Sequence, residues 1–252
     1  MSDTGCYLYA VSRAVSTTDL STIPGLRGAE LRVISHSGLD AIVSEVDLDE
    51  FGEDGLHRNF ENLEWLEEIA RGHDEVVHGV AAIATVAPLR MATICRTDDS
   101  VRTKLDHWHD DLVQALDRVA GRQEWSVKTY AAEHGGAEAA EAAATTGTAY
   151  LQRRRASLAQ ARQAADDAKT VADQVHRELA AASVASRLLQ PQDRRLSGHT
   201  GVMTLNAAYL VDEASANTFR ALVDDIATRY PAARIEMRGP WPPYSFSTLD
   251  AP

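Results

Sequence analysis

Apolar residues in the first quarter of the chain gather into short runs with strand character. The run Cys6–Val11 is rich in aromatic and β-branched residues, which favours a strand. Leu31–Ile34 and Leu39–Val43 are two further apolar runs, and Ser37-Gly38 between them is a typical hairpin connection. The pattern therefore predicts one strand followed by a β-hairpin.

The apolar spacing then changes to a helical one. Apolar positions three and four residues apart predict a helix over residues 56–84, with Gly72 as a point where it can break. Residues 85–94 read as an extended segment. Pro88 places that segment at a sheet edge or a bulge, because proline has no N–H to donate to a ladder. A second helix is predicted over residues 98–119, where aspartates and a serine at its start supply N-cap candidates.

Strands and helices alternate in the second half of the chain. Residues 124–130, 202–211 and 234–238 predict strands, and residues 212–230 predict a helix between the last two. The alanine-rich stretch 137–190 is strong helix material and predicts two or three helices. In that stretch, many of the positions that would face a neighbouring helix are alanine. Alanine buries little apolar area, so we expect these helices to be stable only when they pack on another part of the protein.

These elements predict an α+β protein of two domains. Residues 1–122 form an N-terminal α+β domain. Residues 123–252 form a C-terminal domain whose order of strands and helices is of a ferredoxin-like kind, with a helical insertion over about 137–190.

Charge and cysteine usage narrow the function classes. The formal net charge is −12, which disfavours nucleic-acid binding by the whole surface. Twelve acidic residues against two arginines lie between Glu45 and Glu75, a solvated surface that could also recruit a basic partner. Cys6 and Cys95 lie in apolar runs and are expected to be buried free thiols in a reducing cytosol. No run reaches the roughly 18 apolar residues of a membrane span, and no signal peptide is expected.

Candidate chemistry is sparse. Two histidines in the stretch 106–110 lie about 200° apart on a helix, so both imidazoles cannot reach one metal ion. A metal-dependent hydrolase using His57, His73, Asp74 and Asp106 is the enzymatic alternative, suggested only by a His-Asp dipeptide. The sequence contains no nucleotide-binding glycine loop, nucleophile elbow or Cys-x-x-Cys motif. We therefore predict no catalytic residue, no metal and no cofactor.

The most informative window is Gly239-Pro240-Trp241-Pro242-Pro243-Tyr244-Ser245-Phe246. Its three prolines argue against a helix or a central strand, and Pro242-Pro243 favours a stiff polyproline-II run. The three aromatic side chains are thereby held at fixed relative positions. Two interpretations stay open, and the first is favoured: the aromatics close the core of the C-terminal sheet, or they contact a partner.

Several segments together resemble the GvpF/GvpL family of gas vesicle proteins. These segments are Tyr7–Val11, Trp65-Leu66 with His73–Val76, Val86–Thr93, Glu124–Lys128, Tyr150-Leu151 and Gly239–Phe246. The last is the most specific, and the alanine-rich region 137–149 departs from the family pattern. The motif positions expected to have a structural or partner-contact role are Pro88, Arg90, Trp125, Lys128, Gly239, Pro240, Trp241, Pro242, Pro243, Tyr244 and Phe246.

The resemblance implies a fold and a role. It implies an N-terminal α+β domain and a modified ferredoxin-like domain that carries a helical subdomain. It also implies a non-enzymatic protein of gas vesicle assembly in the cytoplasm, which contacts the shell protein GvpA and other accessory Gvp proteins. We expect deletion of residues 137–190 to weaken binding of the shell protein more than it unfolds the sheets. The F or L branch of the family and self-association stay open.

Overall fold

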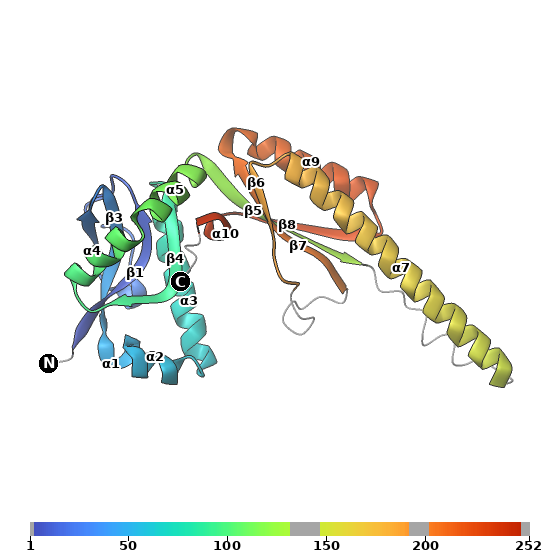
Figure 1. The fold of residues 1–252 in the computed structure, drawn as a ribbon, viewed down its shortest axis with the longest axis horizontal. Helices are drawn as coiled ribbons and strands as arrows, with labels where there is room; N and C mark the ends of the chain where they lie inside the picture. The colour runs from blue at the N-terminus through green and yellow to red at the C-terminus, as the bar shows by residue number, and fades with distance from the viewer. Residues whose placement is uncertain (1–2, 132–146, 192–201, 248–252) are drawn as a thin grey trace. The chain divides into compact units, whose positions relative to one another are not determined.

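The computed structural model describes residues 3–131, 147–191 and 202–247 (Figure 1). The chain divides into two compact units. The first unit holds Met1–Glu124 together with Trp241–Pro252, and the second holds Trp125–Pro240. The chain thus leaves the first unit after Glu124 and returns to it after Pro240, whereas the sequence pattern placed all of residues 123–252 in a C-terminal domain.

The first unit is built on a four-stranded sheet in the order β2-β3-β1-β4. Its strands are β1 (Thr4–Ser12), β2 (Leu31–His36), β3 (Leu39–Asp47) and β4 (Val86–Cys95). Each neighbouring pair is antiparallel. The predicted hairpin is confirmed: Ser37 and Gly38, which join β2 to β3, have positive φ values of 50° and 77°, as a type I′ turn requires.

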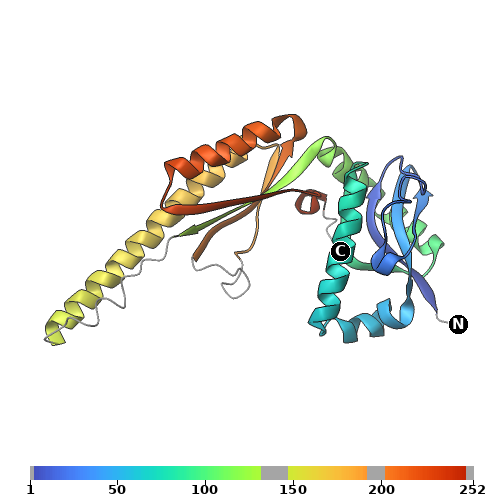
Figure 2. The same ribbon diagram turned by 180° about the vertical axis from the view of Figure 1, so that it is seen from behind.

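Helices cover both faces of this sheet. They are η1 (Leu26–Gly28), α1 (Leu48–Phe51), α2 (Glu53–Asn59), α3 (Leu63–Ala81), α4 (Asp98–His107), α5 (His109–Val119) and α10 (Tyr244–Ser247). Helix α3 packs on one face, while α4 and α5 pack on the other (Figures 1 and 2). The residues of β1 are almost all buried, because successive side chains enter the two cores in turn.

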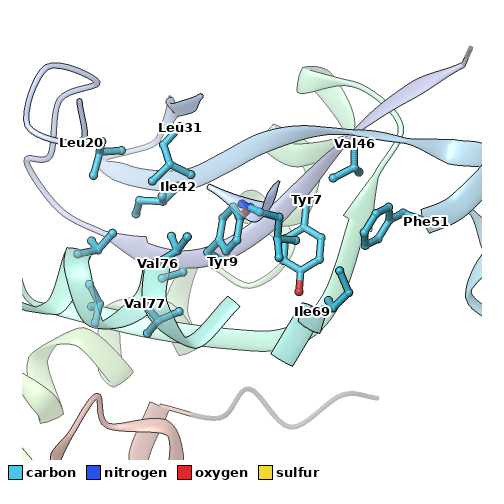
Figure 3. Close-up of a cluster of buried hydrophobic side chains, with 14 of the residues drawn as sticks. Tyr7, Tyr9, Leu20, Leu31, Ile42, Val46, Phe51, Ile69, Val76 and Val77 are labelled. Atoms are coloured by element: carbon cyan, nitrogen blue, oxygen red, sulfur yellow. The ribbon is translucent and has the colours of Figure 1, made fainter. Parts of the chain in front are cut away.

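The core on the α3 side is aromatic. Figure 3 shows Tyr7 and Tyr9 side by side between the sheet and α3, with Ile69, Val76 and Val77 facing them from the helix. The two tyrosine rings lie 4.7 Å apart between centroids. All five side chains are fully buried, so this cluster fixes the helix on the sheet.

The two cysteines are buried free thiols, as predicted. Cys6 on β1 stands opposite Cys95 on β4 in the antiparallel register. Burial raises the pKa of both thiols, so both stay protonated at neutral pH.

The helix predicted over residues 56–84 is two helices, α2 and α3. The break lies at residues 60–62 and not at Gly72, which is inside α3. A Cβ at Gly72 would come within 2.7 Å of Leu26, so this glycine allows the helix to approach η1 closely. Helix α3 begins after Asn62, whose side chain accepts hydrogen bonds from the backbone N–H groups of the first turn.

We expect Asn62→Ala to lower the free energy of unfolding by about 1 kcal/mol, because two N–H groups of α3 lose their acceptor. Urea unfolding measures the change. Asn62→Asp keeps the acceptor and is the matched control, for which little change is expected. An alanine variant as stable as the wild type would show that this cap contributes nothing.

The second unit is built on a sheet in the order β6-β7-β5-β8. Its elements are β5 (Arg122–Ala131), α7 (Gly147–Ala181), β6 (Ala185–Leu188), β7 (Val202–Asp212), η2 (Glu213–Ser215), α9 (Ala216–Arg229) and β8 (Ala233–Trp241). The chain order of strand, helix, two strands, helix and strand, with this spatial order, is the ferredoxin-like arrangement. The predicted fold class is thereby confirmed, but strand β6 was wrongly predicted as helix.

Helix α7 is part of the core of this sheet. Ala172, Val175 and Leu179 near its end are buried in one cluster with Trp125 and Tyr209. The same cluster includes side chains of α9, so both helices pack on one face (Figure 2). Deleting residues 137–190 would therefore remove helix α7 and strand β6 from this packed unit. A loss of binding in that variant could then come from unfolding, so the deletion does not test the binding surface by itself. Among the described helices, α7 included, none is long and apolar enough to cross a membrane.

Candidate functional site

The candidate site is a groove of about 850 Å³ on the first unit. Its walls come from α3, from β4, from the junction of α4 with α5, and from α10. Its lining includes His73, Asp74, the β4 segment 88–94, Lys104, Trp108 and Tyr244. Two sequence motifs, Val86–Thr93 and Gly239–Phe246, lie far apart along the chain and both contribute to this groove.

A bulge in β4 forms one wall of the groove. Leu8 of β1 pairs with Thr93 and Ala10 pairs with Pro88, so four residues of β4, numbers 89–92, stand against the single Tyr9. Ala92 in this bulge has a positive φ of 59°. Strand β4 lies at the edge of its sheet, so the prediction of an edge or bulge at Pro88 is confirmed.

Tyr7 connects the bulge to α3. Its hydroxyl oxygen accepts a hydrogen bond from the N–H of Ala92 at 3.0 Å and lies 3.1 Å from Nδ1 of His73. A hydroxyl oxygen that accepts from Ala92 can also accept from Nδ1 or donate to it, so this contact fits either neutral tautomer of the imidazole.

His73 is held in its neutral form. Only 4% of its surface is exposed, and it stacks on Tyr9 with ring centroids 5.7 Å apart. Burial lowers the pKa of His73 to about 4, although the Leu89 carbonyl and the Asp74 carboxylate favour the charged form. Nε2 is buried, and apart from the Leu89 carbonyl it has no hydrogen-bond partner among the described residues.

The C-terminal run completes the first unit. Pro242, Pro243 and Phe246 are buried there. The carboxylate of Glu124 accepts from the N–H of Ser245 at 2.8 Å and from its hydroxyl at 2.6 Å. The prediction that the aromatics of this run close the core of the C-terminal sheet is wrong, because they pack on the N-terminal unit.

The C-terminal run 239–246 contains regular secondary structure in spite of its three prolines. Gly239, Pro240 and Trp241 continue the edge strand β8, and α10 follows directly after Pro243. The expectation that the run contains no helix is therefore wrong for its last residues. The side chain of Tyr244 on α10 donates a hydrogen bond to Asp74 at 3.3 Å and lines the groove.

The two-sheet architecture and the two motifs at the groove can now be compared with known proteins. Residues 5–248 match the family described as gas vesicle synthesis protein GvpL/GvpF. The chain belongs to this family. Gas vesicle protein L of Streptomyces sp. (strain CB03234) is 40% identical over 96% of this chain and 92% of that protein. Gas vesicle protein L2 of Halobacterium salinarum is 29% identical over 96% and 91%, respectively.

Solved structures of the GvpL/GvpF family share this fold. The crystal structure of gas vesicle protein GvpF from Anabaena sp. PCC7120 has a TM-score of 0.71 and covers 98% of both chains at 19% identity. That of GvpF from Microcystis aeruginosa has a TM-score of 0.68 at 19% identity, over 97% of this chain and 99% of the other. The family and its structural neighbours are gas vesicle proteins and not enzymes.

The residues of the hydrolase alternative are not assembled into a metal site. His57 lies on α2, and His73 is enclosed by tyrosines. The carboxylate of Asp106 lies 2.8 Å from Nε2 of His36, and this contact lowers the pKa of the Asp106 carboxyl. Nowhere in residues 3–131, 147–191 and 202–247 do three or more histidine, cysteine or acidic side chains form a group that could hold a metal ion.

The remaining motif residues lie in different parts of the protein, and only some of them line the groove. Arg90 is exposed on the β4 bulge at the groove. Trp125 is 5% exposed in the core of the second unit, with the Arg220 guanidinium 5.9 Å from its ring centroid. Lys128 is half-buried on β5. Trp241 is 39% exposed and its ring centroid is 5.7 Å from that of His78. Among the predicted candidates, Pro88, Arg90 and Tyr244 therefore meet at the groove.

Sequence reasoning missed Lys104 and Trp108. The sequence predicted one helix over residues 98–119, but that helix breaks at Trp108 into α4 and α5. The tryptophan is half-buried at the groove, and Nζ of Lys104 lies 4.5 Å from its ring centroid. The spacing of four residues between them was a signal, since such residues are neighbours on a helix surface.

Proposed function

We propose that this chain is a non-enzymatic gas vesicle assembly protein that acts in the cytoplasm by binding the hydrophobic shell protein GvpA and other accessory Gvp proteins. Membership of the GvpL/GvpF family supports the gas vesicle role. The observation that carries the binding role is the preformed groove, because family motifs that lie far apart along the chain contribute to it.

The chemistry of the groove suits an apolar partner. Met91 and Ile94 of β4 and Trp108 are only half-buried there, so they present apolar surface to solvent. Fully burying a side chain of this size contributes about 1.5–3 kcal/mol. A shell subunit that exposes apolar surface would aggregate in water, and a groove that covers part of this surface keeps the subunit soluble until it joins the shell.

Edge strand β4 adds a backbone contribution. A strand at the edge of a sheet has one side free of ladder partners, and a partner segment can pair along it. In β4 the bulge at residues 89–92 interrupts such pairing, which limits the partner to the ends of the strand and to the groove. This arrangement favours a short extended segment over a long added strand.

The proposed function predicts co-purification of GvpA with the full chain. The full chain carrying an affinity tag is expressed in cells that make gas vesicles, and bound proteins are identified by mass spectrometry. We expect GvpA and other Gvp proteins above the level found with the tag alone. Recovery of neither GvpA nor any other Gvp protein, from a folded bait, would overturn the proposed function.

A further inference from the structure

The rim of the groove is basic in an acidic protein. The net charge of the chain is −12, yet the groove is lined by Arg71, Arg90 and Lys104 and by one acidic residue, Asp74. Arg71 is paired with Glu67, and Asp74 is held by Tyr244 and by His78 at 3.2 Å. Among the described residues, neither Arg90 nor Lys104 has an ion-pair partner, and Nζ of Lys104 lies over the ring of Trp108. The two cations left over favour a ligand that carries a carboxylate.

His73 belongs to the wall of the groove and does not offer a free donor to it. Its side chain is more than nine-tenths buried, and the Leu89 carbonyl already interacts with the ring. The polar groups open to a ligand are therefore the cationic side chains of Arg90 and Lys104.

Apolar surface lies beside the cationic side chains. Met91 and Ile94 on β4 and the ring of Trp108 are half-buried, and all three line the same groove. A small anion would leave these side chains in water. An extended peptide covers them while an acidic side chain reaches Arg90 and Lys104.

We infer that the groove binds a short extended segment of a partner protein, with an aspartate or glutamate at Arg90 and Lys104 and an apolar side chain against Trp108. The inference rests on the proposed function, since the partner is taken to be a gas vesicle protein. It adds which surface is used and which residue types the partner segment must contain.

Overlapping 15-residue fluorescein-labelled peptides that cover the GvpA of the same cell are the probes, and the full chain is titrated into each by fluorescence anisotropy. We expect binding by peptides that combine apolar residues with an aspartate or glutamate. Arg90→Glu should weaken that binding roughly tenfold or more, because an attractive charge pair becomes repulsive. Arg90 is exposed, so the variant is expected to fold, which circular dichroism checks.

Arg96→Glu is the matched control. Arg96 is also exposed, at 77%, follows β4 directly, and does not line the groove. It makes the same change of charge, and we expect affinity within about twofold of wild type, since a charge outside the site is screened. Exchanging the acidic residue of the bound peptide for its amide should weaken wild-type binding and reduce the effect of Arg90→Glu, as coupled partners require.

Each outcome has a defined meaning. Peptides bound equally by the wild type, Arg90→Glu and Arg96→Glu overturn the groove assignment. Failure of every peptide, while the full chain still captures intact GvpA from cells, overturns this inference and leaves the proposed function standing. Failure of both the peptides and the capture overturns both.

Discussion

Phe246→Ala is expected to lower the free energy of unfolding of the first unit by about 3–5 kcal/mol, the usual cost of removing a buried phenylalanine. Phe246 is 7% exposed and lies on α10. Tyr244 of the same helix packs against the core on the α3 side of the sheet. Its backbone carbonyl accepts from the Arg118 guanidinium at 3.1 Å. The cavity left by alanine would loosen α10 and the wall of the groove with it.

The chain has two compact units, so the measurement must resolve them. Hydrogen exchange with mass spectrometry, at increasing urea, reports each unit by its own peptides. Phe60→Ala is the matched control, because Phe60 is in the same unit and 46% exposed, and a loss of about 1 kcal/mol or less is expected. A loss confined to peptides of the second unit would contradict the assignment of the C-terminal run to the first.

Acidification from pH 7.5 to pH 5 is expected to destabilise the first unit by about 2 kcal/mol through His73 alone. The pKa of His73 falls from an ordinary value of 6.5 to about 4 on folding, so the unfolded chain binds the proton first. Stability is therefore full above pH 6.5 and is lost as the pH falls from 6.5 to 4. The complete loss amounts to about 3 kcal/mol.

The groups around His73 do not cancel this effect. Tyr7 and Tyr9 from β1 and Tyr244 from α10 have pKa values raised by burial, so they stay neutral throughout this range. Asp74 favours the charged imidazole, but its contribution is smaller than that of burial. The protonated ring would remain a charge in an aromatic core, which is the physical reason for the loss.

Urea unfolding of wild type and His73→Phe at pH 7.5 and pH 5 isolates this contribution. The phenylalanine ring keeps the stacking but cannot titrate, so its loss of stability over this range should be about 2 kcal/mol smaller than that of wild type. His109→Gln is the control, because His109 is exposed and the contact with Asp110 raises its pKa. Equal pH dependence in wild type and His73→Phe would show that His73 is not held neutral.

Local patterns were sufficient for much of the fold. The strands near Tyr7 and the hairpin at Ser37-Gly38 follow from apolar alternation and turn chemistry. Strand β6 was missed because Ala185–Leu188 has helix-forming neighbours and becomes a strand only by pairing with β7. The break before α3 was missed although Asn62 is a favourable N-cap residue.

The groove could not be assembled from local patterns. Its motifs were recognised separately, but their meeting depends on contacts such as that between Glu124 and Ser245, which are 121 residues apart. The pair lies across the point where the chain leaves the first unit and later returns to it. Hydrophobic periodicity records which face of an element is buried and does not record which distant segment buries it.

Hydrogen exchange of the full chain, with and without GvpA, tests most directly that the groove of the first unit meets the shell protein. We expect slower exchange at β4 residues 89–94 and at residues 244–247 when GvpA is added, and no such slowing for Arg90→Glu at the same concentrations. Exchange in α7 should not change. Slowing confined to α7 and β6, with β4 unaffected, would contradict the proposed site.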